Sequence, residues 1–300
     1  MEPGRGVPGP RPGAAERPAL ADILEISGLN FRYPDSPKKA VSDFELSVPE
    51  QEIVVLAGPS GCGKSTLLRA VNGLIPHMYT GDYSGQVRVA GSDVKESTMR
   101  DLAQKVGFLF QNPENQIFMF TVERDIAFGL ENLGVPRPEM RRRVDEAMRL
   151  LEIEDLALRA PHELSDGQKQ RVALAGVLAM NPRLVILDEP TSLLDPKTAA
   201  ELVGLVERLK RELGTTFVVV EHRLDLLVKV ADRIVVMNEG RKALEGTPEE
   251  VLFGEEAEGY GVSVPSVTKV QKMLAADGVL GTDRLLSPGE LARSLEEAHP

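Results

Sequence analysis

An apolar segment followed by a glycine-rich loop constrains the fold of this chain more than any other feature. Residues 51–57 read QEIVVLA, and residues 58–65 continue as GPSGCGKS. A compact run rich in Ile and Val that ends at a glycine is typical of a buried strand in a parallel sheet. Helical spacing of apolar residues follows the loop. Because glycines let the backbone curl until its N–H groups point inward, this strand–loop–helix unit predicts a phosphate-binding loop.

The loop predicts a site for ATP and Mg²⁺. Lys64 would reach the β- and γ-phosphates, Ser65 would hold Mg²⁺, and the helix that begins near Lys64 adds the positive end of its dipole. Cys62 occupies a variable position and simply fits there; a sharper hypothesis is that a thiol reagent at Cys62 blocks ATP binding. The residues of this segment that we expect to contact the nucleotide are Gly58, Pro59, Ser60, Gly61, Cys62, Gly63, Lys64, Ser65 and Thr66.

A second apolar run ends in two carboxylates. Residues 184–190 read LVILDEP, so that Asp188 and Glu189 come at the carboxyl end of a predicted buried strand. Asp188 is then placed to hold Mg²⁺ beside Ser65. Glu189 is placed to act as the general base that polarises the attacking water. Acidic residues at strand ends are common, and only the pairing with the phosphate loop favours the catalytic interpretation.

The remaining pattern predicts an α/β fold. Further buried strands are expected at residues 217–220 and 234–237, and helical periodicity at 199–213 alternates with them, which indicates a mainly parallel sheet with crossover helices. Residues 24–48 alternate like antiparallel strands. We divide the chain into a disordered leader (1–20), a main domain (22–250) with a helical insertion at about 112–180, and a C-terminal extension (251–300). The extension carries two amphipathic segments, at residues 266–276 and 288–298.

Composition narrows the partners. The net charge of −11 disfavours broad nucleic-acid binding, which relies on clustered Lys and Arg, and we expect no nucleic-acid partner. No stretch approaches the roughly 18 to 20 apolar residues that cross a bilayer. If a membrane is involved, another polypeptide is expected to span it. A single cysteine fits a reducing compartment. No signal peptide is recognisable, and the chain is expected to be cytosolic.

Residues 164–171, LSDGQKQR, carry the strongest family resemblance. This segment resembles the LSGGQ signature of ABC ATPases, whose core is a P-loop NTPase domain. The resemblance implies a head-to-tail dimer with two ATP molecules, in which Ser165, Gly167 and Gln168 clamp the nucleotide held by the partner's loop. Asp166 departs from the family's commoner glycine and leaves the strength of that clamp open. A plain helix N-cap would also explain Ser165 and Asp166, but not the glycine and glutamine that follow.

Four further positions match the same family in order along the chain. Tyr33 resembles the aromatic residue that stacks on adenine, and Gln111 resembles the glutamine that senses Mg²⁺ and the transporter partner. Asp195 resembles the residue of the loop that couples the two active sites, although an N-cap ahead of Pro196 explains it equally. His222 resembles the γ-phosphate switch. The other histidines are interpreted as structural, namely His77, His162 and His299.

The segments QNPENQIF (residues 111–118) and TVERDIAFG (121–129) resemble the energy-coupling-factor (ECF) group of transporter ATPases. This resemblance implies an ATPase dimer, of identical or of two related chains, on the cytoplasmic face of the membrane. Its expected partners are an integral membrane coupling subunit, received at the loop after Gln111, and a substrate-capture subunit for a vitamin or transition-metal ion. A motor for another ABC transporter class stays open, and so, less favoured, does an ABC ATPase acting on ribosomes or DNA.

Overall fold

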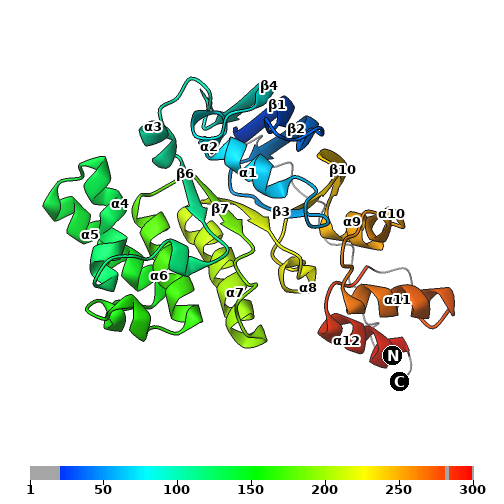
Figure 1. The fold of residues 1–300 in the computed structure, drawn as a ribbon. Helices are drawn as coiled ribbons and strands as arrows, with labels where there is room; N and C mark the ends of the chain where they lie inside the picture. Colours follow the sequence, from blue (N-terminus) through cyan, green and yellow to red (C-terminus); the bar gives the residue numbers. More distant parts are fainter. Residues whose placement is uncertain (1–20, 281–283, 299–300) are drawn as a thin grey trace, which may run out of the picture.

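The apolar strand lies in the middle of a mainly parallel sheet, and the glycine-rich loop follows it at one edge of that sheet (Figure 1). The computed structural model describes residues 21–280 and 284–298; the leader predicted at 1–20 and His299 lie outside this range. Strands β9, β3, β8, β7 and β6 run parallel in that order, and β10 pairs antiparallel with β9. The strands of this sheet are β3 (Ile53–Ala57), β6 (Val106–Leu109), β7 (Leu184–Asp188), β8 (Thr216–Val220), β9 (Arg233–Asn238) and β10 (Arg241–Gly246).

Both faces of this sheet are buried, which explains why its strands read as continuous apolar runs. Val54 and Leu56 of β3 point into one hydrophobic cluster, and Val55 between them points into the other. The strand begins at Ile53 rather than at Gln51, because Gln51 takes a left-handed backbone (φ 60°) after β2. Residues 238–240 form the turn between β9 and β10.

The antiparallel strands predicted from residues 24–48 are confirmed, and they belong to a second sheet. Its order is β2-β1-β4-β5. Its buried side chains share one cluster with Leu67 and Leu68, which face it from the helix after the phosphate loop. The helix after the phosphate loop is therefore packed between the antiparallel sheet and the parallel strands. The strands are β1 (Asp22–Arg32), β2 (Val41–Pro49), β4 (Asp82–Val89) and β5 (Ser92–Asp93).

A helical region separates β6 from β7, as the sequence predicts, and extends to one side of the sheets in Figure 1. Helix α6 is the buried axis of this region, because α4 and α5 both pack on it. The elements are η1 (Pro113–Asn115), α4 (Val122–Leu133), α5 (Arg137–Leu151), η2 (Glu154–Leu156), η3 (Pro161–Glu163) and α6 (Asp166–Ala179). The core helices are α1 (Lys64–Val71), α2 (Leu74–His77), α3 (Met99–Ala103), α7 (Pro196–Leu213) and α8 (Leu224–Leu227).

The C-terminal part contains the two predicted helices and two that the sequence analysis missed. Helices α11 (Ser266–Ala276) and α12 (Pro288–Ala298) match the expected segments. The missed helices are α9 (Pro248–Phe253), which runs across residue 250, and α10 (Glu256–Gly259). Leu252 and Ala257 are fully buried in the same cluster as Val55, so this part is packed onto the sheet. Among the described residues, none of the helices has the length and apolar character to cross a membrane.

Candidate active site

The phosphate loop connects β3 to α1 through backbone conformations that favour glycine. Gly58 and Gly63 have φ values of 136° and 113°. A Cβ atom at Gly58 would lie 2.1 Å from the carbonyl oxygen of Met237, and one at Gly63 would lie 2.3 Å from that of Ala40. Neither position therefore accepts a side chain, and the curled loop follows from close backbone packing as well as from torsion angles.

Lys64 opens helix α1 and bends back over the loop. Its Nζ donates to the carbonyl oxygens of Gly58 at 2.7 Å and Pro59 at 3.0 Å, and the residue is only 6% exposed. The ammonium group is thus held where the backbone curls, at the positive end of the α1 dipole. A positive charge at the start of a helix suits a triphosphate. Ser65 and Thr66 follow on the first turn of the same helix.

A cluster of polar side chains gathers where β6, β7 and β8 end. Glu189 accepts a hydrogen bond from Gln111 Nε2 at 2.8 Å, and its other carboxylate oxygen lies 3.2 Å from His222 Nε2. The His222 contact is favourable when Nε2 carries the proton. The three residues are far apart in the chain and meet because parallel strands end at the same edge of the sheet. Asp188 precedes Glu189 at this edge.

The electrostatics of this edge suit a cation. Burial raises the pKa of Asp188, the neighbouring Glu189 carboxylate raises it further, and Lys64, Arg69 and His222 act in the opposite direction. The oxygen donors expected for a metal are those of Ser65, Asp188 and Gln111. Mg²⁺ prefers oxygen ligands and is bound through one or two carboxylates together with phosphate oxygens, so these residues fit Mg²⁺. When bound, Mg²⁺ would neutralise charge on the phosphates.

Tyr33 lies against helix α1, beside the phosphate loop. Its hydroxyl is 3.2 Å from Thr66 Oγ1 and accepts a hydrogen bond from Arg69 Nη1 at 2.9 Å. The ring of Phe31 packs edge-on against the ring of Tyr33, with 4.8 Å between centroids. Tyr33 is therefore tied to the helix that follows the loop. Its role in stacking on adenine stays a prediction.

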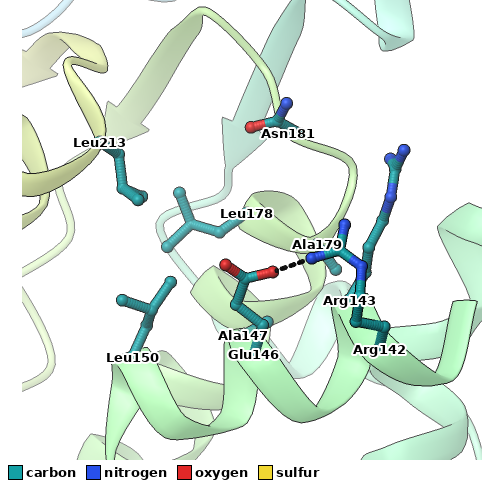
Figure 2. A pocket seen from close by; sticks show the side chains of 9 residues that line it. All are labelled: Arg142, Arg143, Glu146, Ala147, Leu150, Leu178, Ala179, Asn181 and Leu213. Atoms are coloured by element: carbon teal, nitrogen blue, oxygen red, sulfur yellow. Dashed lines mark hydrogen bonds and ion pairs between the residues drawn. The ribbon is translucent and has the colours of Figure 1, made fainter. Parts of the chain in front are cut away.

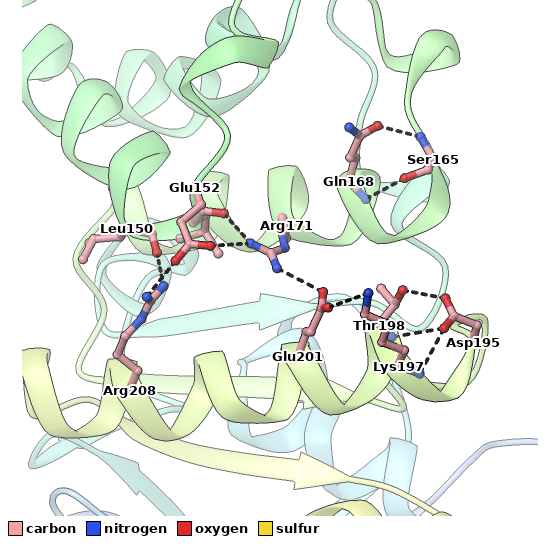
Figure 3. A network of polar contacts seen from close by, with 11 residues as sticks. Leu150, Glu152, Ser165, Gln168, Arg171, Asp195, Lys197, Thr198, Glu201 and Arg208 are labelled. Atoms are coloured by element: carbon pink, nitrogen blue, oxygen red, sulfur yellow. Dashed lines mark hydrogen bonds and ion pairs between the residues drawn. The ribbon is translucent and has the colours of Figure 1, made fainter.

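The residues expected to clamp a second nucleotide form a separate group at the starts of α6 and α7 (Figure 3). Ser165 is the N-cap of α6: its hydroxyl accepts from Gln168 N at 3.3 Å, and Gln168 Oε1 accepts from Ser165 N at 3.0 Å. Asp195 caps α7 by accepting from Lys197 N at 3.0 Å and from Thr198 N at 3.2 Å. Both N-cap interpretations are thus confirmed.

An open hollow of about 490 Å³ lies between these two helix starts. Ser165, Gly167, Gln168 and Asp195 line it, whereas the phosphate-loop residues do not, as far as the described residues show. Asp166 also lines it, is 67% exposed in its side chain and lies 3.8 Å from Lys169 Nζ, which partly offsets its charge. The predicted site residues therefore fall into two groups within one chain.

The sequence analysis assigned no role to a polar network that joins α5, α6 and α7. Arg171 of α6 donates to the carbonyl oxygen of Leu151 at 3.0 Å and lies 3.3 Å from Glu152 and 3.6 Å from Glu201. Arg208 of α7 pairs with the same Glu152 at 2.7 Å (Figure 3). The network links the helix behind the Ser165 group to the helix behind Asp195. The charged positions gave no signal of it, because its partners come from three separate segments.

Glu221, which lies between β8 and His222, is a further residue to which the sequence analysis assigned no role. It is 2% exposed and bonded to Thr191 and to the backbone of His222. A charged residue directly after an apolar strand, next to a predicted switch histidine, was the available signal. The histidines interpreted as structural are described at two positions: His77 contacts the carbonyl oxygen of Val94 at 2.9 Å, and His162 lies in η3.

A further cavity of about 200 Å³ lies between α5 and the C-terminal ends of α6 and α7 (Figure 2). The ion pair between Arg142 and Glu146, 2.9 Å apart, crosses its lining. Its other lining residues include Leu178, Asn181 and Leu213. None of the predicted site residues lines this cavity among the described positions, so it is separate from the strand edge.

Comparisons with known proteins match this geometry to one family. Residues 41–192 match the sequence profile of the ABC transporter family. The energy-coupling factor transporter ATP-binding protein EcfA1 of Lacticaseibacillus paracasei is 42% identical over 87% of this chain and 92% of its own length. A Methanosarcina mazei relative, with the provisional name ABC transporter ATP-binding protein, is 41% identical over 84% of this chain. The match covers 43% of that longer protein, so this chain spans less than half of it.

Two solved structures share the fold. The cbiO1 structure from Clostridium perfringens, described as part of the ABC transporter complex cbiONQ, is 35% identical with a TM-score of 0.72, over 84% of this chain and 99% of that one. A dimeric ATP-binding cassette in a post-hydrolysis state, bound to ADP and phosphate, is 29% identical with a TM-score of 0.65. That match covers 75% of this chain and 99% of the cassette.

Proposed function

The chain belongs to the ABC transporter family of ATP-binding proteins, and from this premise we propose that it is the ATP-hydrolysing subunit of an ECF-type importer. The observation that carries the proposal is the contact of Glu189 with both Gln111 and His222 at the edge of the sheet that also holds the phosphate loop. A carboxylate oriented by two neighbours is what a general base for water requires. The names of the relatives support the ECF assignment.

In the proposed reaction, the loop N–H groups and Lys64 bind the β- and γ-phosphates. Ser65 and Asp188 would hold Mg²⁺. Glu189 accepts a proton from the attacking water, whose oxygen forms a bond to the γ-phosphorus while the bond from that phosphorus to the bridging oxygen breaks, which releases ADP and phosphate. His222 contacts the γ-phosphate from the next strand and keeps the Glu189 carboxylate oriented.

We place the second group of residues on a partner's nucleotide. Ser165, Gly167 and Gln168 lie at the N-terminus of α6, where the positive end of the helix dipole favours phosphate oxygens. Because they line a hollow separate from the phosphate loop, a head-to-tail dimer supplies their nucleotide. The dimeric state of the similar cassette bound to ADP and phosphate supports this arrangement. ATP then drives closure through its tighter binding to the closed dimer.

We propose that the membrane subunit docks beside the loop after Gln111. Phe118, Phe120 and Leu158 are 61%, 83% and 77% exposed there. They are brought together because the backbone at the start of α4 hydrogen-bonds to that of residues 157 and 159. Adjacent exposed apolar side chains of this size mark an interaction surface. The protein is thereby held at the cytoplasmic face of the membrane, and a separate capture subunit selects a vitamin or a transition-metal ion.

Glu189→Gln tests the hydrolytic assignment. The substitution keeps the side-chain shape but removes the base, so the rate of hydrolysis should fall by about 10²- to 10⁴-fold while ATP still binds. Glu146→Gln, an exposed carboxylate of α5, is the matched control and should leave the rate unchanged. Hydrolysis by Glu189→Gln at the unsubstituted rate would show that another group is the base. Lys64→Ala should lose nucleotide affinity.

The transport assignment is tested with the same variant. Tagged Glu189→Gln protein, loaded with ATP and Mg²⁺, is recovered from detergent-solubilised membranes of its source, and its partners are identified by mass spectrometry. A coupling membrane protein together with a small capture protein is the expected result. Two large membrane domains without a capture subunit would assign another transporter class. Recovery of ribosomes or DNA-bound proteins would contradict the proposed role in transport.

A further inference from the structure

Glu221 is a buried carboxylate beside Glu189 and His222 of the proposed active site. It follows β8 directly, precedes His222 and is 2% exposed. N–H and O–H donors, rather than a cation, surround its charge among the described residues. Taking an ionised carboxylate out of water is unfavourable unless hydrogen bonds replace the water. These hydrogen bonds therefore offset the burial of the Glu221 carboxylate, and their partners indicate which segments it holds in place.

The two oxygens of Glu221 bind two different segments. Oε1 accepts from the backbone N–H of Thr191 at 3.2 Å and from the Thr191 hydroxyl. Oε2 accepts from the backbone N–H of His222 at 2.7 Å and of Arg223 at 3.2 Å. One carboxylate thus joins the turn that carries Glu189 to the turn that carries His222.

Glu189 needs such a constraint because its backbone is strained. Its φ is 48°, in the left-handed region that residues with a side chain rarely adopt, and Pro190 follows. A conformation of this kind persists only where the surroundings determine it. Glu189 N also donates to the carbonyl oxygen of Val220 at 2.9 Å, so both ends of the turn are tied to the segment from Val220 to Glu221.

We propose that Glu221 is a positioning residue for ATP hydrolysis, which holds the Glu189 turn and His222 in register through these hydrogen bonds. This inference rests on the proposed ATPase function. Glu221 does not touch the nucleotide or the attacking water. It acts by fixing the 3.2 Å contact between Glu189 Oε1 and His222 Nε2. A displacement of about 1 Å in such a group can cost roughly 100-fold in rate.

The test is Glu221→Gln in the full chain. Glutamine has the same shape but only one acceptor oxygen, so its NH₂ group must face either the Thr191 donors or the His222 and Arg223 N–H groups. We expect kcat for ATP hydrolysis to fall by about 10- to 100-fold. The dissociation constant for ATP, measured with a fluorescent analogue, should stay within a factor of about three, because the phosphate loop is not involved.

Two further variants keep the test decisive if Glu221→Gln folds poorly. Thr191→Val removes only the hydroxyl donor and should lower kcat by less than Glu221→Gln does; in the double variant the two losses should not add. Glu52→Gln is the matched control, since Glu52 is a half-buried carboxylate whose pKa burial raises, paired with Arg233 at 2.8 Å before β3. It should leave kcat unchanged.

The outcomes distinguish failure of the positioning role of Glu221 from failure of the proposed ATPase function. An unchanged kcat in Thr191→Val or Glu221→Gln overturns the positioning role. A parallel loss of ATP affinity and thermal stability, with kcat per bound ATP unchanged, also overturns it, because Glu221 would then only support the fold. Absence of ATP binding and hydrolysis in the unsubstituted chain refutes the proposed function itself.

Discussion

Helices α6 and α7 pack closely at their starts, where Gly167 faces Thr198. A Cβ atom at Gly167 would lie 2.6 Å from Thr198 Cγ2, closer than side chains approach each other. Thr198 is itself held by Asp195, which accepts hydrogen bonds from its N–H and its hydroxyl. Gly167→Ala therefore forces apart two helix starts whose positions define the clamp for a partner's nucleotide.

Gly204, in the exposed part of α7, is the matched control because a Cβ atom there meets nothing within 4 Å. Gly204→Ala should raise the free energy of unfolding by about 0.8 to 1 kcal/mol through helix propensity alone. Overpacking at Gly167 costs about 1 to 3 kcal/mol. Gly167→Ala should consequently be less stable than Gly204→Ala by about that amount. Thr198→Ser removes Cγ2, keeps the hydroxyl and should restore stability to Gly167→Ala.

Urea-induced unfolding of the nucleotide-free chain measures these differences, followed by circular dichroism. The comparison is made at one protein concentration and includes Gly167→Ala, Gly204→Ala, Thr198→Ser and the double variant Gly167→Ala/Thr198→Ser. Equal gains in Gly167→Ala and Gly204→Ala would refute the close packing of α6 on α7. The close packing would also be refuted if the stability of the double variant equalled the sum of the effects of Gly167→Ala and Thr198→Ser.

Two further predictions concern pH. Burial raises the pKa of the Cys62 thiol, so alkylation by iodoacetamide should be slow near pH 7 and accelerate as the pH rises. Bound ATP should slow the alkylation. Full ATP binding after complete alkylation would dismiss Cys62 as a blocking site. Arg142 and Arg143 lower the pKa of Glu139 from 4.5 to about 2. Because the folded-state pKa is depressed, this contribution to stability is present above about pH 4.5 and lost as the pH falls toward 2. The stability gap between the unsubstituted chain and Glu139→Gln, followed by thermal unfolding, should close over that range; a constant gap would contradict the ion pairs.

Features that depend on neighbouring residues along the chain could be predicted from the amino-acid sequence. Continuous apolar runs made residues 184–187 and 217–220 recognisable as strands, because a strand buried on both faces needs apolar side chains at successive positions. The glycines of the phosphate loop were equally readable, since their backbone torsion angles exclude most other residues. The helices at 266–276 and 288–298 followed from apolar spacing, whereas α9 and α10 were too short for periodicity to reveal.

Which polar groups meet depends on how the strands and helices pack in three dimensions. Gln111, Glu189 and His222 follow three different strands, and the parallel register of those strands brings Gln111 within 2.8 Å and His222 within 3.2 Å of Glu189. The four hydrogen bonds of Glu221 likewise depend on the turn after β7 lying beside the end of β8. Hydrogen bonds depend on distance and direction in space, and a linear pattern carries neither for residues that other elements bring together.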